Sequence, residues 1–315
     1  MQYNQLGATG LSVSRLCFGT LTISPLQRFF SIPEGARLIR AALEMGVNFI
    51  DTAEIYECYP YIREALAGYS GDAVIATKTY AYSSAGMEQS IAKCLKELNR
   101  EYIDIMQLNE QESVYTVKGH WEAVEAMVRA REKGWVRAIG ISTHYVAGVR
   151  AAASIPEFDV IHPIINKFGI GIQDGQTEDM LEAISFAAIM GKGLYGMKCL
   201  GGGHLIPQAD EALSFILSVR ELASVAVGMQ SLEEVEYNAA RFSGHEPVAD
   251  LRKKLNGNKR TLHIEKWCRG CGRCVEKCSA GALEVIQGAV KVNMLRCRLC
   301  GYCAAVCPEF CIKVI

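Results

Sequence analysis

The chain has 315 residues, half of them hydrophobic, 13 cysteines and a formal net charge of −1. This length can bury one large core and leave a small second module, and no stretch approaches the roughly 18 consecutive apolar residues of a membrane span. The N-terminal residues show neither the charged nor the apolar region of a secretory signal, so we expect a cytoplasmic protein that does not bind membranes.

Short apolar runs alternate with amphipathic segments of helical period from residue 13 onward. Eight such units in about 240 residues have the number and length of a closed α/β barrel, the (β/α)8 TIM barrel. An open doubly wound sheet is the alternative, but it would be expected to carry a Gly-rich turn after its first strand, and CFGTLTIS is not one. The expected strands are 14–20, 48–53, 73–79, 103–109, 136–142, 160–166, 193–200 and 224–229.

Polar residues end several of the expected strands, where the chemistry of such a barrel collects. These strand ends carry Asp51, Lys78, Asn109, Ser142, Asn166 and Lys198, with Tyr56 at the start of the loop after Asp51. Asp51 and Lys78 come from neighbouring strands, which favours an ion pair. A lysine near a tyrosine hydroxyl lowers the tyrosine pKa, which would make Tyr56 a usable proton donor and acceptor. A purely structural ion pair beside a core tyrosine is the alternative.

The motifs FIDTAEIY, IATK, IDIMQLNE, AIGIST, GLYGMKCLGGG and VAVGMQSLEEVEYN resemble the aldo-keto reductase superfamily, in the same order, across residues 1–242. The resemblance implies a catalytic tetrad of Asp, Tyr, Lys and His, in which Tyr protonates a carbonyl oxygen while nicotinamide hydride attacks the carbon. Asp51, Tyr56 and Lys78 match three members. Ser142 and Asn166 would hold the nicotinamide carboxamide, and the residues at the adenosine end would be Gly228, Ser231 and Asn238.

The sequence also departs from the family pattern. Asn109 replaces the tetrad histidine; it can donate a hydrogen bond but cannot be protonated, and His144 is either its substitute or an ordinary loop histidine. Met197 stands where many relatives stack an aromatic ring on the nicotinamide, next to Lys198. Gln230 and Glu234 stand where relatives place cations for the adenosine 2′-phosphate, which disfavours NADPH. NADH, NADPH or no dinucleotide therefore remain open.

The segment 201–203, GGG, follows a strand and admits two interpretations: a phosphate cradle formed by backbone N–H groups, or a simple turn. The polar stretch 246–260 then predicts a linker between a barrel at 1–245 and a second domain at 261–315.

Nine cysteines crowd the last 48 residues, and two runs share the spacing C-x2-C-x2-C-x3-C. Three cysteines at such gaps wrap one cubane cluster, while the fourth reaches across to the other cluster. We therefore expect two [4Fe-4S] clusters, one held by Cys268, Cys271, Cys274 and Cys307 and the other by Cys297, Cys300, Cys303 and Cys278. Zinc sites use well-separated pairs of ligands instead. Residues 260–315 resemble bacterial two-cluster ferredoxins, with Ser279 in place of a usual proline. Cys311 is expected to be a buried thiol.

Residues 256–315 carry ten Lys or Arg and four Asp or Glu. Such a basic tail can indicate nucleic acid, but two anionic clusters would neutralise most of it, so we expect no nucleic-acid partner.

The leading hypothesis is an iron–sulfur oxidoreductase that interconverts a small carbonyl compound and its alcohol, with electrons exchanged through the clusters and an electron-transfer protein as partner. The alternative is an electron-transfer or redox-sensing protein whose barrel has lost catalysis, and in a third interpretation the clusters only pin the tail over the barrel mouth. Nicotinamide delivers two electrons and each cluster carries one. The usual adapter is a flavin, for which the sequence shows no motif.

Overall fold

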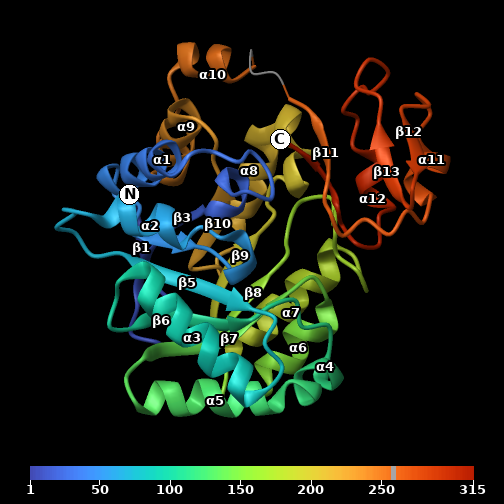
Figure 1. Ribbon diagram of the computed structural model, residues 1–315. Helices are drawn as coiled ribbons and strands as arrows, with labels where there is room; N and C mark the ends of the chain where they lie inside the picture. The colour runs from blue at the N-terminus through green and yellow to red at the C-terminus, as the bar shows by residue number, and fades with distance from the viewer. Residues whose placement is uncertain (257–259) are drawn as a thin grey trace.

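The computed structural model describes residues 1–256 and 260–315 and shows a closed barrel with a smaller C-terminal module beside it (Figure 1). The barrel strands are all parallel and follow the order β10-β3-β4-β5-β6-β7-β8-β9, which confirms the TIM barrel expected from the sequence. Their bounds are β3 (Leu16–Gly19), β4 (Phe49–Asp51), β5 (Val74–Thr79), β6 (Ile103–Leu108), β7 (Val136–Thr143), β8 (Val160–Pro163), β9 (Gly193–Met197) and β10 (Ser224–Gly228).

A helix follows each barrel strand. Local signals set their ends: the Ser31 N–H donates to the Glu34 carboxylate at the start of the first helix, and Asn99 in the left-handed region ends the third. The helices are α1 (Ile32–Glu44), α2 (Tyr59–Leu66), α3 (Ser84–Leu98), α4 (Val114–Gly119), α5 (Trp121–Glu132), α6 (Val146–Ala153), α7 (Thr177–Ile189), α8 (Ala209–Ser218) and α9 (Leu232–Phe242). Short 3-10 turns are η1 (Thr20–Ile23), η2 (Glu54–Tyr56), η3 (Gly201–Gly203) and η4 (Ile206–Gln208).

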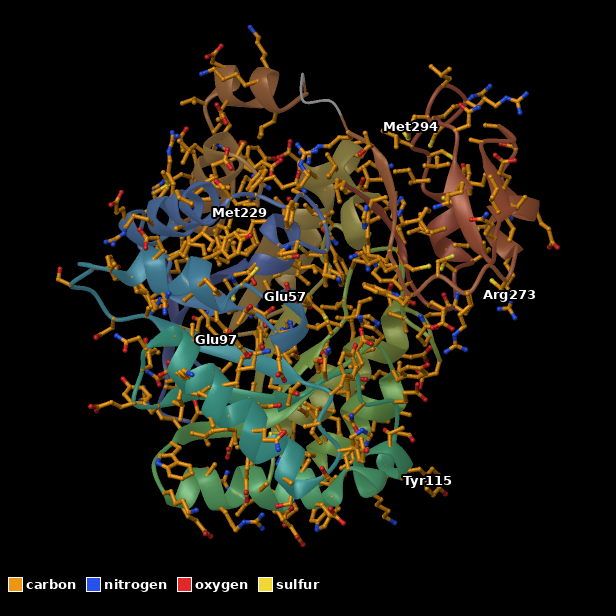
Figure 2. The ribbon with its side chains drawn as sticks, in the orientation of Figure 1. Glu57, Glu97, Tyr115, Met229, Arg273 and Met294 are labelled. Carbon is orange, nitrogen blue, oxygen red and sulfur yellow. The ribbon has the colours of Figure 1, made fainter. Side chains whose placement is uncertain are left out.

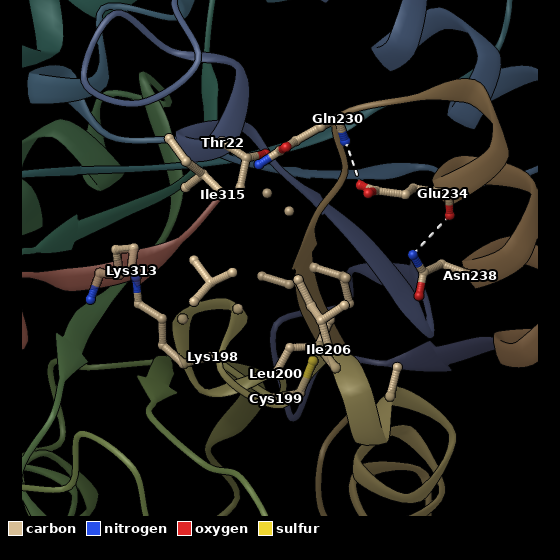
Figure 3. A pocket seen from close by; sticks show the side chains of 18 of the residues that line it. Thr22, Lys198, Cys199, Leu200, Ile206, Gln230, Glu234, Asn238, Lys313 and Ile315 are labelled. Atoms are coloured by element: carbon tan, nitrogen blue, oxygen red, sulfur yellow. Dashed lines mark hydrogen bonds between the residues drawn. The ribbon is translucent and has the colours of Figure 1, made fainter. Parts of the chain in front are cut away.

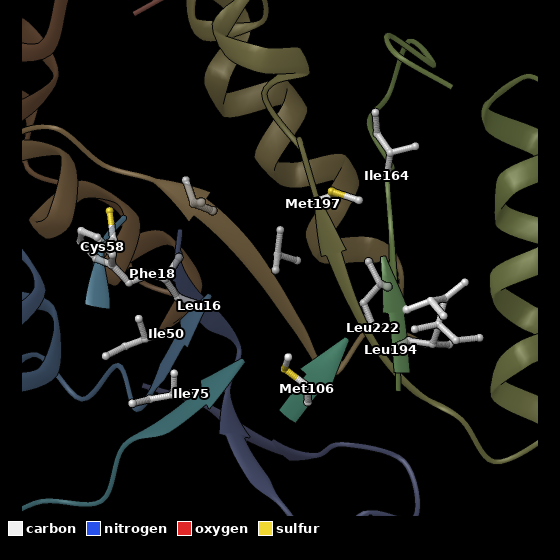
Figure 4. Packing of buried hydrophobic residues seen from close by; sticks show 14 of the residues in the cluster. Leu16, Phe18, Ile50, Cys58, Ile75, Met106, Ile164, Leu194, Met197 and Leu222 are labelled. Atoms are coloured by element: carbon white, nitrogen blue, oxygen red, sulfur yellow. The ribbon is translucent and has the colours of Figure 1, made fainter. Parts of the chain in front are cut away.

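The two-residue period of the strands sorts their side chains into two layers. Leu16, Phe18 and Ile50 face outward into the large apolar layer under the helices (Figure 4). Cys17 and Phe49 alternate with these residues along β3 and β4, and they belong to a second apolar cluster inside the barrel. The inward-facing residues that follow this second cluster along each strand therefore form the floor of the barrel mouth.

A hairpin of β1 (Tyr3–Gln5) and β2 (Ser12–Ser14) closes the opposite end of the barrel. A Cβ on Gly7 would lie 2.3 Å from the backbone nitrogen of Gly193, the first residue of β9, so the hairpin packs directly against the strand starts. The other end, where the strands finish, opens into the cavity described below.

The C-terminal module consists of two short helices and two small antiparallel sheets, with Arg273 at its outer edge and Met294 near its top (Figure 2). Gly272 and Gly301, both in the left-handed region, occupy equivalent places before the two helices. The elements are β11 (Leu262–Ile264), α11 (Arg273–Lys277), β12 (Leu283–Ile286), β13 (Ala289–Val292), α12 (Tyr302–Ala305) and β14 (Ile312–Val314). No helix in the described part of the chain is long and apolar enough to cross a membrane.

The segment expected to be a linker contains helix α10 (Ala249–Asn256), and residues 257–259 of that segment lie outside the described residues. The chain then runs back over the barrel mouth. β11 pairs with β14, and the Thr261 and Ile315 backbones exchange hydrogen bonds of 2.8 and 3.0 Å. Phe310 is only 2% exposed and packs into the barrel's own apolar cluster, so the module is anchored to the barrel by a core side chain.

Candidate active site and candidate metal centres

A buried ion pair lies at the floor of the barrel mouth. Lys78 Nζ contacts both Asp51 carboxylate oxygens at 2.7 and 2.8 Å and also donates to the Thr52 carbonyl at 2.7 Å. The Lys78 side chain is 2% exposed and that of Asp51 is 7% exposed. The strand register explains the pairing, because Asp51 lies opposite Ala76 and Lys78 is the next inward-facing residue of β5.

Tyr56 is held beside this pair by the turn η2. The carboxylate of Glu54, at the start of the turn, accepts hydrogen bonds from Thr79 Oγ1 at 2.7 Å and Ser90 Oγ at 2.8 Å, which fixes the turn against β5 and α3. Lys78 Nζ lies 5.5 Å from the centre of the Tyr56 ring. The Tyr56 hydroxyl forms no hydrogen bond to another described residue, so it is available to a ligand.

The direction of the Tyr56 pKa differs from the sequence-based expectation. Burial, with the negative charges of Asp51 and Glu110, raises the pKa of Tyr56 well above its ordinary value of 10.0. Lys78 does not offset this, because all three of its ammonium contacts are to Asp51 and the Thr52 carbonyl. Tyr56 therefore stays protonated over the ordinary pH range, which suits a proton donor.

Three further inward-facing residues complete the floor, and the sequence analysis did not identify them. The Tyr195 hydroxyl lies 2.7 Å from Gln107 Oε1 and 3.0 Å from Asp51 Oδ1, and it donates to these acceptors. His162 stacks on the Tyr195 ring at 3.8 Å, and burial lowers the pKa of His162 to about 3, so it is neutral. The two-residue alternation that places Asp51 and Lys78 inward would also have found Gln107, His162 and Tyr195.

Asn109, Ser142 and Asn166 are buried beside the mouth, with their side chains bonded to the protein. Ser142 Oγ donates to Asn109 Oδ1 at 2.8 Å and accepts from the Glu110 N–H at 2.9 Å. Asn166 Oδ1 and Nδ2 both bond the backbone of Ile170, which closes the loop after β8. These three side chains do not line the cavity at the mouth.

A cavity of about 480 Å³ runs from the barrel floor to the start of α9 (Figure 3), a volume within the range of small-molecule sites. Residues that the sequence placed at the catalytic and dinucleotide positions line it: Asp51, Tyr56, Met197, Lys198, Gly228, Gln230, Glu234 and Asn238. At its far end, Asn238 Nδ2 donates to the Glu234 carbonyl at 2.8 Å, while its buried Oδ1 has no hydrogen-bond partner among the described residues. An acceptor left unbonded in a cavity fits a ligand with an N–H group. Ser231 instead caps α9, accepting from the Glu234 N–H at 3.2 Å.

A cation from outside the barrel changes the charge at this far end. Arg260, just before β11, pairs with Glu234 and lies 3.3 Å from Gln230 Oε1. The acidic charge expected to disfavour an adenosine 2′-phosphate is therefore neutralised within the protein.

His144 packs edge-on against Phe310, with ring centres 5.7 Å apart, and does not line the cavity. Burial lowers its pKa to about 4. The histidine that does line the cavity is His162.

The module's cysteines surround two separate cavities. One is lined by Cys268, Cys271, Cys274, Cys307 and also Cys311, and the other by Cys278, Cys297, Cys300 and Cys303. Backbone N–H groups point at the sulfurs, from Val290 to Cys268 at 3.5 Å and from Ala282 to Cys278 at 3.3 Å. Five thiols around the first cavity and four around the second, with N–H donors to sulfur, supply the four ligands that each cubane cluster needs. In the described residues no group of His, Cys, Asp or Glu is arranged to hold a single metal ion.

Cys311 is buried, as expected, and its sulfur lies 3.4 Å from that of Cys307.

Comparison with known proteins agrees with this architecture. Among curated proteins, the chain is similar to the L-galactose dehydrogenase of Arabidopsis thaliana (24% identity, 81% of this chain and 92% of that protein). It is also similar to the pyridoxine 4-dehydrogenase of Escherichia coli (25% identity, the same coverage) and, over about half of each chain, to a probable voltage-gated potassium channel subunit beta of Arabidopsis thaliana (26% identity).

Among solved structures, a putative aldo-keto reductase from Pseudomonas aeruginosa matches with a TM-score of 0.66 (23% identity, 77% of this chain and 95% of that one). The aldo-keto reductase AKR11C1 from Bacillus halodurans, in its holo form, matches with a TM-score of 0.65 (21% identity, 81% and 95%). Residues 261–308 match a 4Fe-4S dicluster domain, and residues 15–211, well over half of the chain, match the aldo/keto reductase family model. The chain therefore belongs to the aldo/keto reductase family, as an oxidoreductase that carries a 4Fe-4S dicluster domain.

Proposed function

We propose that the protein interconverts a small carbonyl compound and its alcohol in the barrel cavity, with Tyr56 as proton donor and acceptor. The observation that carries this proposal is the Tyr56 hydroxyl, without a hydrogen-bond partner among the described residues, in a cavity also lined by Asp51 of the Asp51–Lys78 pair. The printed names of two relatives, L-galactose dehydrogenase and pyridoxine 4-dehydrogenase, support the same reaction class.

The chain's own residues supply binding, orientation and a proton. Tyr56 donates its phenolic proton to the carbonyl oxygen, and its raised pKa keeps that proton in place until the substrate takes it. Asp51 and Lys78 would act as positioning residues, since their ion pair fixes the Lys78 ammonium 5.5 Å from the centre of the Tyr56 ring. Asn109, whose Oδ1 accepts from Ser142, does not line the cavity and would need to turn toward it before its amide N–H could reach a substrate oxygen.

We further propose that NADH or NADPH binds along the cavity, where it would supply the hydride. Gly228 and Asn238 would line the adenosine end, and Met197 would contact the nicotinamide. Ser142 and Asn166, expected to hold the carboxamide, would need to exchange their present protein hydrogen bonds for ligand ones. The barrel at 1–245 and the module at 261–315 would act as the two functional domains.

The two thiol sets would hold two [4Fe-4S] clusters, which supply one-electron transfer, with a small protein carrier as electron partner. We expect Cys268→Ser to remove roughly half of the iron and acid-labile sulfide, because it deletes a ligand of one cluster. Cys311→Ser is the matched control: it lies in the same cavity, outside both sets, and should keep the full iron content. Iron and sulfide analysis of anaerobically purified protein measures both; equal losses in the two variants would contradict the ligand assignment.

An anaerobic titration tests whether hydride and single electrons meet in this chain. Protein with both clusters is titrated separately with NADH and NADPH while the visible cluster absorbance and the EPR signal of the reduced state are recorded. We expect bleaching by a dinucleotide, which would also direct a search for a bound flavin. Normal reduction by dithionite without bleaching by either dinucleotide, and without dinucleotide binding, would contradict the proposed cofactor and favour a barrel that serves electron transfer alone.

A further inference from the structure

Two lysines from distant parts of the chain form a cationic wall of the cavity. Lys198 follows β9 and Lys313 lies on β14, and both line the cavity (Figure 3). Their ammonium groups lie over the same ring, that of Phe310, at 5.7 Å and 3.2 Å from its centre. Lys313 also donates to the Phe310 carbonyl, whereas the Lys198 ammonium has no hydrogen-bond or ion-pair partner among the described residues.

Burial of these two ammonium groups is unfavourable. Burial lowers the pKa of Lys198 and of Lys313, and the charge of Lys198 lowers that of Lys313 further. The carboxylates near them are committed elsewhere. Asp51 pairs with Lys78, Glu110 accepts from Tyr80, and Glu265 accepts from Gln27 and contacts His263. A desolvated cation without a close counterion is costly unless a ligand provides one.

The backbone of Lys198 supports a functional reason for this arrangement. Its φ is 60°, in the left-handed region that residues other than glycine rarely adopt. This conformation turns the chain from β9 into the glycine turn 201–203 while the lysine remains at the cavity wall. Strained non-glycine residues of this kind are concentrated at ligand sites.

We propose that Lys198 and Lys313 bind an anionic oxygen group, and that this group is the carboxylate of the substrate, so that the substrates are oxo acids and the corresponding hydroxy acids. The inference rests on the proposed carbonyl–alcohol reaction and adds its substrate class. The same chemistry would bind the pyrophosphate of a dinucleotide. The substrate is favoured because Lys198 directly follows β9, the strand whose Tyr195 bonds Asp51 at the catalytic end.

The substrate site is then completed by the iron–sulfur module, which contributes Lys313. The glycine turn 201–203 makes room for it: a Cβ on Gly203 would lie 2.0 Å from the Val314 carbonyl oxygen, and one on Gly202 would lie 3.0 Å from Lys313 Cδ. His204 also contacts the Ile312 carbonyl at 3.0 Å. Residues 201–203 form a turn, one of the two interpretations of this segment, and the turn also seats β14.

Calorimetric titration of the holoprotein with pyruvate and phenylpyruvate, and with their neutral amides, tests the subsite without turnover. Each acid should bind more tightly than its amide. Lys198→Met should weaken acid binding by about tenfold or more, the loss expected for one charge-assisted contact, and Lys313→Met should act in the same direction. Lys198→Arg, which keeps the charge, should retain binding, and Lys96→Met, at an exposed position of α3, should change nothing.

Titration with ADP-ribose separates the two sources of anion. If Lys198→Met weakens the acids and leaves ADP-ribose unchanged, the subsite belongs to the substrate; the reverse pattern assigns it to the dinucleotide and overturns the proposal. Acids that bind no better than their amides also overturn it. Should Lys198→Met fail to fold, as judged by cluster absorbance, Lys198→Gln and the acid–amide comparison in the unchanged protein still decide. Tyr56→Phe should bind the acids normally, so loss of turnover there tests the reaction separately from the subsite.

Discussion

Tyr56→Phe is expected to lower carbonyl turnover by a factor of about 10²–10⁴, the contribution of a positioned proton donor. The substitution removes one hydroxyl that forms no hydrogen bond to another described residue, so folding and cluster content should be unchanged. The rate of dinucleotide oxidation by the holoprotein with a panel of aldehydes, ketones and oxo acids measures the effect. The fall should appear in kcat, because the proton is needed in the transition state.

Tyr115→Phe is the matched control for this prediction. Tyr115 lies on α4, 79% exposed, and projects away from the barrel mouth (Figure 2). It loses the same atom at a site with no role in the proposed reaction. Equal turnover by Tyr56→Phe and the unchanged protein would contradict the role of Tyr56 as proton donor. The Asp51–Lys78 pair would then be a structural feature.

Lys78→Met is expected to destabilise the barrel by about 3–5 kcal/mol, because it leaves the Asp51 carboxylate buried without its counter-charge. The exposed fractions of the two side chains, 2% and 7%, leave little room for water to replace the ammonium. The Tyr195 hydroxyl remains as a hydrogen-bond donor to Asp51 and offsets only part of the loss. The midpoint of urea unfolding, followed by far-UV circular dichroism under anaerobic conditions, measures the change.

Lys93→Met provides the comparison. Lys93 also pairs with a carboxylate, that of Glu54 at 3.3 Å, but the two side chains are 45% and 26% exposed. Removing this exposed pair should cost less than about 1 kcal/mol. The double variant Asp51→Asn, Lys78→Met should regain part of the stability lost in Lys78→Met, since no buried charge is left unpaired. Similar midpoints for Lys78→Met and Lys93→Met would contradict this account of the barrel floor.

Local sequence determined the barrel and the arrangement of the cysteines. Strand and helix periods are properties of short segments. Seven of the eight expected strands contain the observed one, and β7 extends one residue beyond the expected 136–142. The cysteine spacings within each run are also local, and each expected set of four lines one of the two cavities, with Cys311 beside the first set. Asp51 and Lys78 could be paired from sequence because neighbouring parallel strands bring their inward-facing ends together.

Three residues of the barrel floor were not predicted from the sequence, although the two-residue alternation of strand side chains applies to them as well. Gln107, His162 and Tyr195 follow the same two-residue alternation as Asp51 and Lys78, but only one polar residue of each strand end had been considered. The direction of the Tyr56 pKa was likewise beyond the sequence, because it depends on burial and on which acceptors occupy the Lys78 ammonium.

The wall of the cavity was decided only by tertiary structure. Lys313 lies 115 positions beyond Lys198 in the sequence, and Arg260 reaches Glu234 across the boundary between the domains. No local period of the sequence predicts these contacts. They follow from the docking of β14 on the glycine turn and of Phe310 in the barrel core. The sequence alone therefore determined the two modules and the chemistry that each can carry. Their packing decided that they share one cavity, because contacts between distant segments form only when both apolar surfaces are buried together.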